Sequence, residues 1–390
     1  MAYISSNANR FYTALESAYG SVATITASNR IPAVKLTVQN QLETTNRKDK
    51  TGSRTFPGLP AGGRRRTAFE LQTYLTSWQR AIGGGPAYGP LFQAALGAVP
   101  QQFAGGTVAS ATSAGRVAFG AAHGLSVGQG VAAGGELRFV AAIVDTVTVQ
   151  LNAPFTTTPA TGATLGASIT YTPSTELPSA TIFDYWDPST AVQRFLPGAA
   201  VDQLEIRVNG DFHEFRFSGM AQDVVDSSSY TSTVADGPSF PAEPGLLAFD
   251  YSVVPGNLGQ AWLGSTPTQF FTITNASLVL KNNLDMRMNE FGSSLPLCIS
   301  PGQRTVTAAV DLYSQDDTAT AGLYQAARQQ SPVSVMFQLG EAAGQVMAVY
   351  LDSVIPQVPE FNDGKNRLQW QFRPSRAQGT VNNEIAVAFG

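Results

Sequence analysis

Three pairs of similar segments recur along this sequence in the same order. They are LTVQNQLE (from Leu36) with LVLKNNLD (from Leu278), GGRRRTAFELQTYL (from Gly62) with PGQRTVTAAVDLY (from Pro301), and LFQAAL (from Leu91) with LYQAAR (from Leu323). The interval shrinks slowly, from 242 residues at the first pair to 232 at the third, as changes in loop length would produce. Because one six-residue match is weak but three collinear ones are not, we infer a unit that occurs twice.

Each copy of the unit predicts a strand, a long loop, a second strand and a helix. In the first strand Leu36, Val38 and Leu42 alternate with polar residues, which is typical of a half-buried strand. Both copies end this strand with a carboxylate, Glu43 or Asp285. The second strand of each copy begins with Arg-Thr after a glycine turn, with a register uncertain by one residue.

After the predicted helix the two copies differ in spacing. In the second copy a strand at 333–339 follows within a few residues, whereas its expected counterpart at 204–209 comes more than 100 residues after the first helix. Strands at 214–218 and 345–350 are expected next. We therefore expect an insertion in the first copy: a small all-β module at 103–172, rich in Gly, Ala, Thr and Val, whose two ends meet.

The predicted fold is mainly β, with two tandem sandwich or barrel domains, each flanked by one helix. The predicted boundaries are 1–102 with 173–255 for the first domain, 103–172 for the insertion, and 256–390 for the second domain. A short N-terminal helix is also expected, because Phe11, Ala14, Leu15 and Ala18 follow helical spacing and Gly20 is a natural stop.

Composition restricts what such a chain can do. Only 13% of its residues are charged against 43% hydrophobic ones, which favours a protein that covers much of its surface with neighbours. The net charge of −4 gives no basic field that would attract nucleic acid. One cysteine allows no internal disulfide, and the start of the sequence lacks signal-peptide features, so we expect synthesis in the cytoplasm and no membrane span.

No segment makes a convincing catalytic, cofactor or metal site, and we expect a protein that is not an enzyme. Gly124-Leu-Ser-Val-Gly128 matches the G-x-S-x-G pattern beside His123, but the glycine-rich residues after it do not favour the helix that a nucleophile elbow needs. A turn is the alternative that we favour. Asp316 and Asp317 could suggest a metal, but a helix cap before Leu323 explains them better.

A loop at 46–66 concentrates basic side chains against a single acid. It could contact phosphate, it could be a solvated hairpin tip, or it could pair with an acidic face of another copy. These alternatives stay open, and we take the loop as a candidate contact between subunits or rings. Its basic residues are Arg47, Lys48, Lys50, Arg54, Arg64, Arg65 and Arg66.

Taken together, these segments resemble the tail tube proteins of long-tailed bacteriophages. The resemblance rests on the N-x-L-[ED] strand ends, the glycine turn before Arg-Thr and an alternating strand, the segment 350–358 and the N-terminal run 14–20. It covers both copies but not the insertion. Since most tube proteins carry one such domain and form hexameric rings, a duplicated chain resembles the subclass in which three subunits form a pseudo-hexameric ring.

The resemblance implies a function as well as a fold. It implies a structural virion protein, assembled in the host bacterial cytoplasm, whose rings stack into a tail tube that conducts DNA without binding it specifically. The implied partners are further copies of the chain and the tail terminator, tape measure and distal tail proteins, with no cofactor. Candidate lumen residues are Gln39, Gln41, Glu43, Lys281, Asn283 and Asp285.

Two other classes of protein remain open at this point. A distal tail or hub ring of the same machine would use the same domain without polymerising. An all-β receptor-binding or carbohydrate-binding virion protein would share the composition but would not need a repeat that closes a ring.

Overall fold

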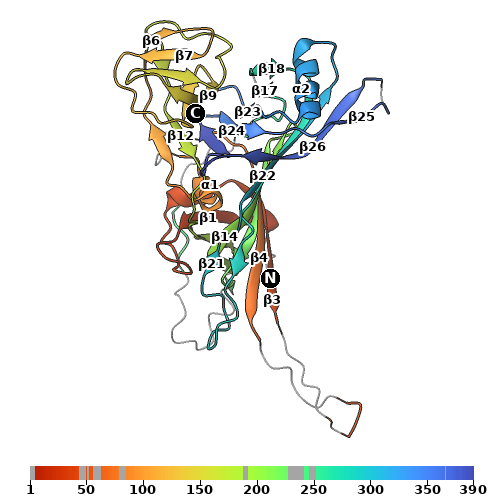
Figure 1. Ribbon diagram of the computed structural model, residues 1–390. Helices are drawn as coiled ribbons and strands as arrows, with labels where there is room; N and C mark the ends of the chain where they lie inside the picture. Colours follow the sequence, from red (N-terminus) through yellow and green to blue (C-terminus); the bar gives the residue numbers. More distant parts are fainter. Residues whose placement is uncertain are drawn as a thin grey trace.

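The computed structural model describes residues 5–43, 50, 52–55, 63–78, 85–187, 192–226, 241–245, 252–264, 266–364 and 366–390. The protein is mainly β, as predicted, and strands form its body, its projecting arm and its inserted module (Figure 1). Two short 3-10 turns, η1 (Ser6–Ala8) and η2 (Ala27–Asn29), flank the first strand. The C-terminus lies beside the inserted module, at the end of the molecule away from the arm.

One long antiparallel sheet runs through the centre of the molecule and takes strands from both copies of the repeat. Its eight described strands lie side by side in an order set by their backbone pairings. The order is β3 (Ala33–Leu42), β4 (Arg65–Tyr74), β15 (Glu214–Ala221), the second half of β14 (Val192–Val208), β19 (Ile273–Lys281), β22 (Thr305–Tyr313), β26 (Gln369–Gln378) and β25 (Glu360–Asn362).

A short sheet accompanies each copy. The first runs β2 (Arg30–Ile31), β1 (Arg10–Leu15), β13 (Ala180–Asp187), the first half of β14, and β16 (Val225–Asp226). The second runs β18 (Thr268–Phe270), β17 (Gly259–Gly264), β23 (Val333–Leu339), β24 (Met347–Val354), β27 (Ala386–Phe389), β12 (Ser168–Tyr171) and β5 (Gln101–Phe103). Between each short sheet and the long sheet lies the hydrophobic core.

The same strand pairings occur twice. β1 pairs with β2 and β13, and β17 pairs in the same way with β18 and β23. The pairs β3–β4 and β19–β22 correspond, and each is followed by a helix, α1 (Gly89–Leu96) or α2 (Thr318–Gln329). The repeat found in the sequence is therefore present in the topology, and both predicted helices are confirmed.

The pairings correct one detail of the predicted repeat and settle another. Because β13 pairs with β1 as β23 pairs with β17, the counterpart of 333–339 is Ala180–Asp187 and not 204–209. The register of the two Arg-Thr strands, which the sequence left uncertain by one residue, is now fixed: Thr67 is buried while Thr305 is half-exposed, so the two threonines lie on opposite faces and do not correspond. Leu36 opposite Leu71 and Leu278 opposite Ala308 give the true register.

The predicted N-terminal helix is wrong, because residues 10–15 form strand β1, which pairs along its two edges with β2 and β13. Phe11 packs in the main hydrophobic core and the next residue, Tyr12, packs in a separate aromatic cluster, so β1 is covered on both faces. A strand buried on both sides shows no alternation in sequence, and its aromatic residues favour a strand once neighbours supply the hydrogen bonds.

The inserted module is a six-stranded sheet in the order β11 (Thr164–Leu165), β6 (Gly106–Ala111), β7 (Arg116–Phe119), β10 (Thr148–Leu151), β9 (Glu136–Ile143) and β8 (Gly130–Ala133). It has its own hydrophobic cluster. Its ends meet as predicted, because β5 pairs with β12 at its base. This base adds to the second short sheet through β12 and β27, so the insertion in the first copy packs on the second copy.

Arg138 fastens the module to the second copy. Its fully buried guanidinium donates to Gln338 Oε1 (3.0 Å) and Gln260 Oε1 (2.8 Å), lies 4.9 Å from the ring centre of Trp262, and pairs with Glu136. Burial lowers the pKa of Arg138 to about 10. The ion pair and the hydrogen bonds offset the cost of burying the charge, so the module is held by a satisfied polar contact.

Candidate assembly surfaces

The long sheet ends in two open edges. Among the described residues, β3 pairs along one side only with β4, and β25 pairs along one side only with β26. Edge strands present a row of unpaired backbone N–H and C=O groups that can accept another strand. Figure 1 shows that β3 and β4 run out of the body together as an arm, while β25 lies near α2 at the other end.

Inside the chain, the two copies of the repeat are joined by the same kind of contact. The second half of β14 pairs with β19 over six residues, from Gln203 opposite Lys281 to Val208 opposite Ala276. We call this pairing the internal joint. It makes one continuous sheet from four strands of the first copy and four of the second, which shows that this sheet can extend from one copy to the next.

Apolar side chains are exposed at both open edges. Val34 on β3 is 49% exposed, and Phe361 on β25 is 56% exposed. Phe361 contacts two aromatic rings, Tyr324 of α2 at 6.2 Å and Trp370 of β26 at 5.8 Å between ring centres. Both open edges therefore combine free backbone groups with apolar surface, which are the two properties of a protein interface.

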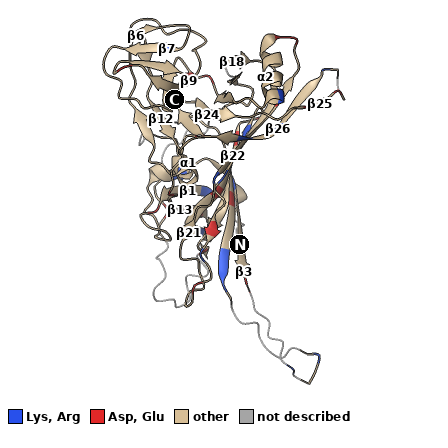
Figure 2. Ribbon diagram, viewed as in Figure 1, with Lys and Arg blue, Asp and Glu red and all other residues tan. Residues whose placement is uncertain are grey.

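The face of the long sheet that points away from the core is polar and largely neutralises its own charges. Arg207 on β14 pairs with Glu205 (2.7 Å), and Arg216 on β15 pairs with Glu214. The two pairs lie side by side, because Glu205 is opposite Arg216 in the sheet. At the open edge, Arg373 of β26 pairs with Glu360 of β25. Figure 2 shows few charged residues on the inserted module and more along these strands.

The predicted lumen residues are all exposed and none lies in the core. Gln39 lies on the polar face of β3, and Lys281 is the last residue of β19 on the same face. The remaining predicted lumen residues lie at the end of β3 or in the segments that follow the two strands. Which surface they line in an assembly stays a prediction. The exposed set is Gln39, Gln41, Glu43, Lys281, Asn283 and Asp285.

The structure separates the predicted basic loop into parts. Arg47 and Lys48 lie outside the described residues, and Lys50 and Arg54 are exposed on the arm. The arginines at the base of the arm contact three places in their own chain: the loop between β20 (Asp285–Met286) and β21 (Ile299–Ser300), the segment between β15 and β16, and strand β3. These contacts are Arg64 to Asn289 Oδ1 (3.0 Å), Arg65 to Asp223 (3.5 Å), and Arg66 to Gln41 Oε1 (2.7 Å).

The pairing of Arg65 with Asp223 is a weak one. Burial raises the pKa of Asp223, and the backbone N–H of Val224 and the charge of Arg65 lower it by less. Since the Arg65 side chain is 44% exposed, water screens its charge. The base of the arm is therefore positioned mainly by backbone contacts, such as the Arg65 N–H donating to the Ser294 carbonyl at 2.8 Å.

The G-x-S-x-G segment forms a turn in the inserted module, with both glycines at positive φ and β8 after it. The imidazole of His123 is occupied: Nδ1 accepts the Leu125 N–H (2.9 Å) and Nε2 donates to the Asp145 carbonyl (3.0 Å). With both nitrogens engaged, His123 is not positioned to take a proton from Ser126.

The aspartate pair behaves as predicted at the start of α2, where Asp317 caps the helix by accepting the Thr320 N–H at 2.7 Å. Within the described residues no three His, Cys, Asp or Glu side chains gather as metal ligands would. No helix in that part of the chain is long and apolar enough to cross a membrane.

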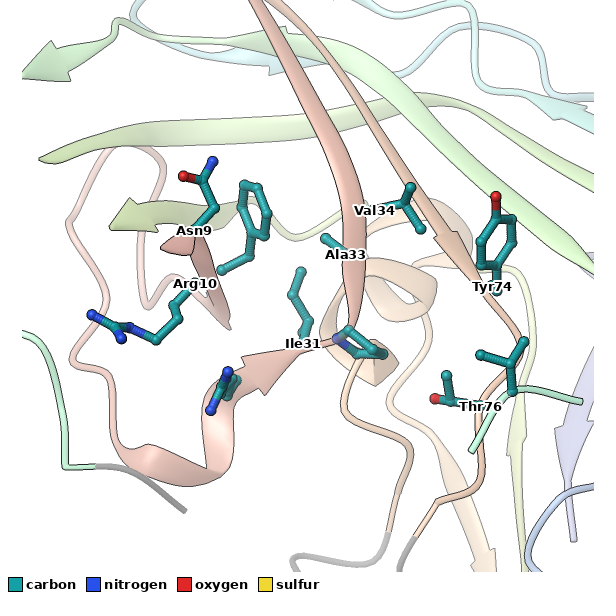
Figure 3. A pocket seen from close by; sticks show the side chains of 11 residues that line it. Asn9, Arg10, Ile31, Ala33, Val34, Tyr74 and Thr76 are labelled. Atoms are coloured by element: carbon teal, nitrogen blue, oxygen red, sulfur yellow. The ribbon is translucent and has the colours of Figure 1, made fainter. Parts of the chain in front are cut away.

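Two surface cavities occupy corresponding places in the two copies. The first, of about 250 Å³, lies where β2 leads into β3 and is lined by Arg10, Ile31, Val34, Tyr74 and other residues (Figure 3). The second, of about 300 Å³, lies at the start of β19, and Val208 and Asn209 form part of its wall. In the second cavity these two residues come from the other copy of the repeat.

No protein-family model matches this sequence, and no curated protein matches it. Among solved structures, one similar chain is the tail tube of SPP1, determined by solid-state NMR and cryo-EM. It is 12% identical, and the match covers 33% of this chain and 81% of that one with a TM-score of 0.27. A TM-score of this size does not establish a shared fold.

Proposed function

We propose that this chain is a structural virion protein whose copies join through the open edges of the long sheet into rings, and that the rings stack into a phage tail tube. The observation that carries the proposal is the internal joint, where strands β14 and β19 extend the sheet from one copy of the repeat to the next. Because β19 accepts β14 inside the chain, the corresponding open edge at β3 is expected to accept a strand from another copy. Ring closure removes all such edges.

Strand geometry indicates how many chains close a ring. Strands lie about 4.8 Å apart and tilt by about 40° in barrels, so three chains with 24 strands give a wall about 48 Å across between backbones. Two chains give about 32 Å. Inward side chains occupy about 5 Å on each side, which leaves a bore of about 38 Å for three chains and about 22 Å for two. Only the wider bore leaves clearance around a DNA duplex, so we propose three chains.

The polar face of the long sheet suits the wall of a DNA channel. Its arginines would bind phosphate if they were free, but Arg207 and Arg216 are each paired with a glutamate on the same strand. A wall with neutralised arginines and many amide and hydroxyl groups releases few counterions to DNA, so the duplex slides without strong binding. The candidate lumen residues Gln39 and Lys281 lie on this face.

Electron microscopy of the purified protein at increasing concentration tests the proposal. Stacked hollow rings are the expected result. Single rings that never stack would favour a distal tail or hub ring, which uses the same edges without polymerising. Chains that stay monomeric at every concentration would contradict the ring and favour a receptor-binding or carbohydrate-binding protein.

A further inference from the structure

The internal joint supplies a template for the contact between chains. At its end, Arg207 lies opposite Ser277 and Val208 lies opposite Ala276. Val208 packs against the hydrophobic core at this position, and Ala276 is fully buried. The corresponding ends of β25 and β3 have no such cover within the described part of the chain.

The positions that correspond to the internal joint follow from the repeat. Leu278 of β19 corresponds to Leu36 of β3, so Ser277 corresponds to Lys35. The next position of β3 is a bulge: Ala33 lies opposite Thr73 and Lys35 opposite Gln72, which leaves Val34 as the extra residue. Ala276, opposite Val310, therefore corresponds to Ala33 with Val34 bulged beside it. On the other side, β15 and β26 share the sequence Phe-Arg-x-Ser, which makes Glu214 correspond to Gln371.

Pairing across the hairpins then identifies the residues of β25. Glu214 lies opposite Arg207, while Gln371 lies opposite Glu360. Glu360 therefore takes the place of Arg207, and the next residue, Phe361, takes the place of Val208.

We propose that β25 of one chain pairs antiparallel with β3 of a second copy, with Glu360 opposite Lys35 and Phe361 against the bulge formed by Ala33 and Val34. This inference rests on the proposed function and specifies the interface that closes the ring. The occupant of each open edge is a second copy of this chain.

The side chains at these positions are complementary. Glu360 and Lys35 carry opposite charges, and both are exposed in the single chain. Opposite charges directly across an antiparallel pair stabilise it, whereas like charges destabilise it. Phe361 and Val34 are apolar and about half-exposed. Phe361 lies opposite Trp370, and Trp370 and Ala33 both pack against the hydrophobic core, so Phe361 and the bulge at Ala33 meet on the core side of the sheet. The proposed contact therefore places opposite charges together on the polar face of the sheet and apolar side chains together on the core face.

The cavity beside Val34 provides the seat for Phe361. In the second copy, Val208 and Asn209 of the joined strand wall the corresponding cavity. In the first copy, no described residue of a strand that corresponds to β14 lines the cavity. Its wall includes Asn9, Arg10, Ile31, Val34 and Tyr74, as Figure 3 shows. A phenylalanine in place of Val208 fills more of such a cavity and brings aromatic area to the centre of the interface.

Disulfide trapping tests the register. In a Cys298→Ser background, Lys35→Cys with Glu360→Cys is expected to give chains linked to one another under mild oxidation, up to a closed set of three. The two positions lie on opposite edges of the sheet, about 34 Å apart within one chain at ordinary strand spacing, so any disulfide joins two chains. Thr37→Cys with Glu360→Cys is the matched control, because diagonal neighbours lie about 7–8 Å apart and beyond easy disulfide reach.

A second variant tests the seat of Phe361. Phe361→Ser is expected to raise the protein concentration needed for assembly at least about tenfold, as loss of a central aromatic contact does, while the single chain stays folded. Val381→Ser removes a side chain that is 79% exposed away from both edges and is expected to leave assembly unchanged.

The outcomes separate this inference from the proposed function. Rings that form without the 35–360 disulfide, or that link through the 37–360 control instead, would overturn the proposed register and leave the ring intact. Absence of any assembly in the unmodified protein would overturn both. Assembly that is indifferent to Phe361→Ser would overturn the seat in the cavity.

Discussion

Phe92 and Tyr324 occupy the same place in the two copies of the repeat, and the structure predicts that replacing Phe92 by alanine mainly destabilises the fold whereas replacing Tyr324 mainly weakens assembly. Phe92 on α1 is fully buried and contacts five rings, those of Tyr88, Tyr171, Phe215, Phe217 and Phe389, at 5.2–5.9 Å between centres. Two of the five come from β12 and β27, so the chain itself covers α1.

Tyr324 on α2 is only half-buried and contacts Phe361 and Trp370, at 6.2 and 5.2 Å. In the proposed ring, Tyr324 lies beside the edge strand β25 that contacts the next chain. Phe92→Ala should lower the free energy of unfolding by about 3–5 kcal/mol, since it leaves a large cavity among five rings. Tyr324→Ala should lower it by about 1–2 kcal/mol, because two aromatic pairs at about 0.5–1.5 kcal/mol each are lost at a site already in contact with water.

The assay is urea unfolding of the dispersed single chain, followed by sedimentation of the same variants at increasing concentration. Tyr324→Ala should keep the fold but require at least about tenfold more protein to assemble. Phe92→Leu, which leaves a smaller cavity, provides a folded comparison if Phe92→Ala does not accumulate. Equal destabilisation by Phe92→Ala and Tyr324→Ala, or normal assembly of Tyr324→Ala, would refute the reasoning.

Three further outcomes follow from other parts of the structure. Arg138→Ala should lower the free energy of unfolding by about 3–5 kcal/mol, because it removes a buried guanidinium, leaves Gln260 and Gln338 without their donor, and takes the cation from the partly buried Glu136. Arg116→Ala on the same module should change it by less than about 0.5 kcal/mol, and heat or urea unfolding measures both. Glu205→Gln with Glu214→Gln frees two arginines, and the assembled protein should then retain DNA at low salt and release it as salt rises, in a filter-binding assay. Burial raises the pKa of Asp311, so its folded-state pKa exceeds the unfolded one, and its contribution to stability is lost as pH rises through the folded value. Asparagine does not ionise, so the melting temperature of Asp311→Asn should rise relative to that of the unmodified protein between pH 4 and pH 7.

The repeat was visible in the sequence because its signals are local. Alternation in 36–42 and the two Leu-x-Gln-Ala-Ala helices depend on each segment's own pattern of buried positions, so the strands and helices were predicted correctly. β1 was missed because it is covered on both faces, which removes the alternation that marks a half-buried strand. Only its neighbours in space decide that it is a strand.

The contacts between the copies could not be predicted from the sequence. The β14–β19 pairing joins residues about 75 positions apart, and nothing in either segment specifies the partner. The role of Arg138 depends on Gln260 and Gln338, which lie more than 120 residues away. The one available signal was that Arg138 is among the few charged residues of an apolar module. The predicted basic loop gathers charge in sequence, yet the structure engages Arg64, Arg65 and Arg66 at the base of the arm within the same chain.

In the proposed ring, copies of this chain continue the long sheet from edge to edge. A cryo-EM reconstruction of the assembled protein tests it most directly. We predict a ring of three chains whose inner wall is one unbroken sheet of 24 strands, with β25 of each chain hydrogen-bonded to β3 of the next. A ring held together by the inserted module or the arms, with β3 and β25 still unpaired, would contradict it.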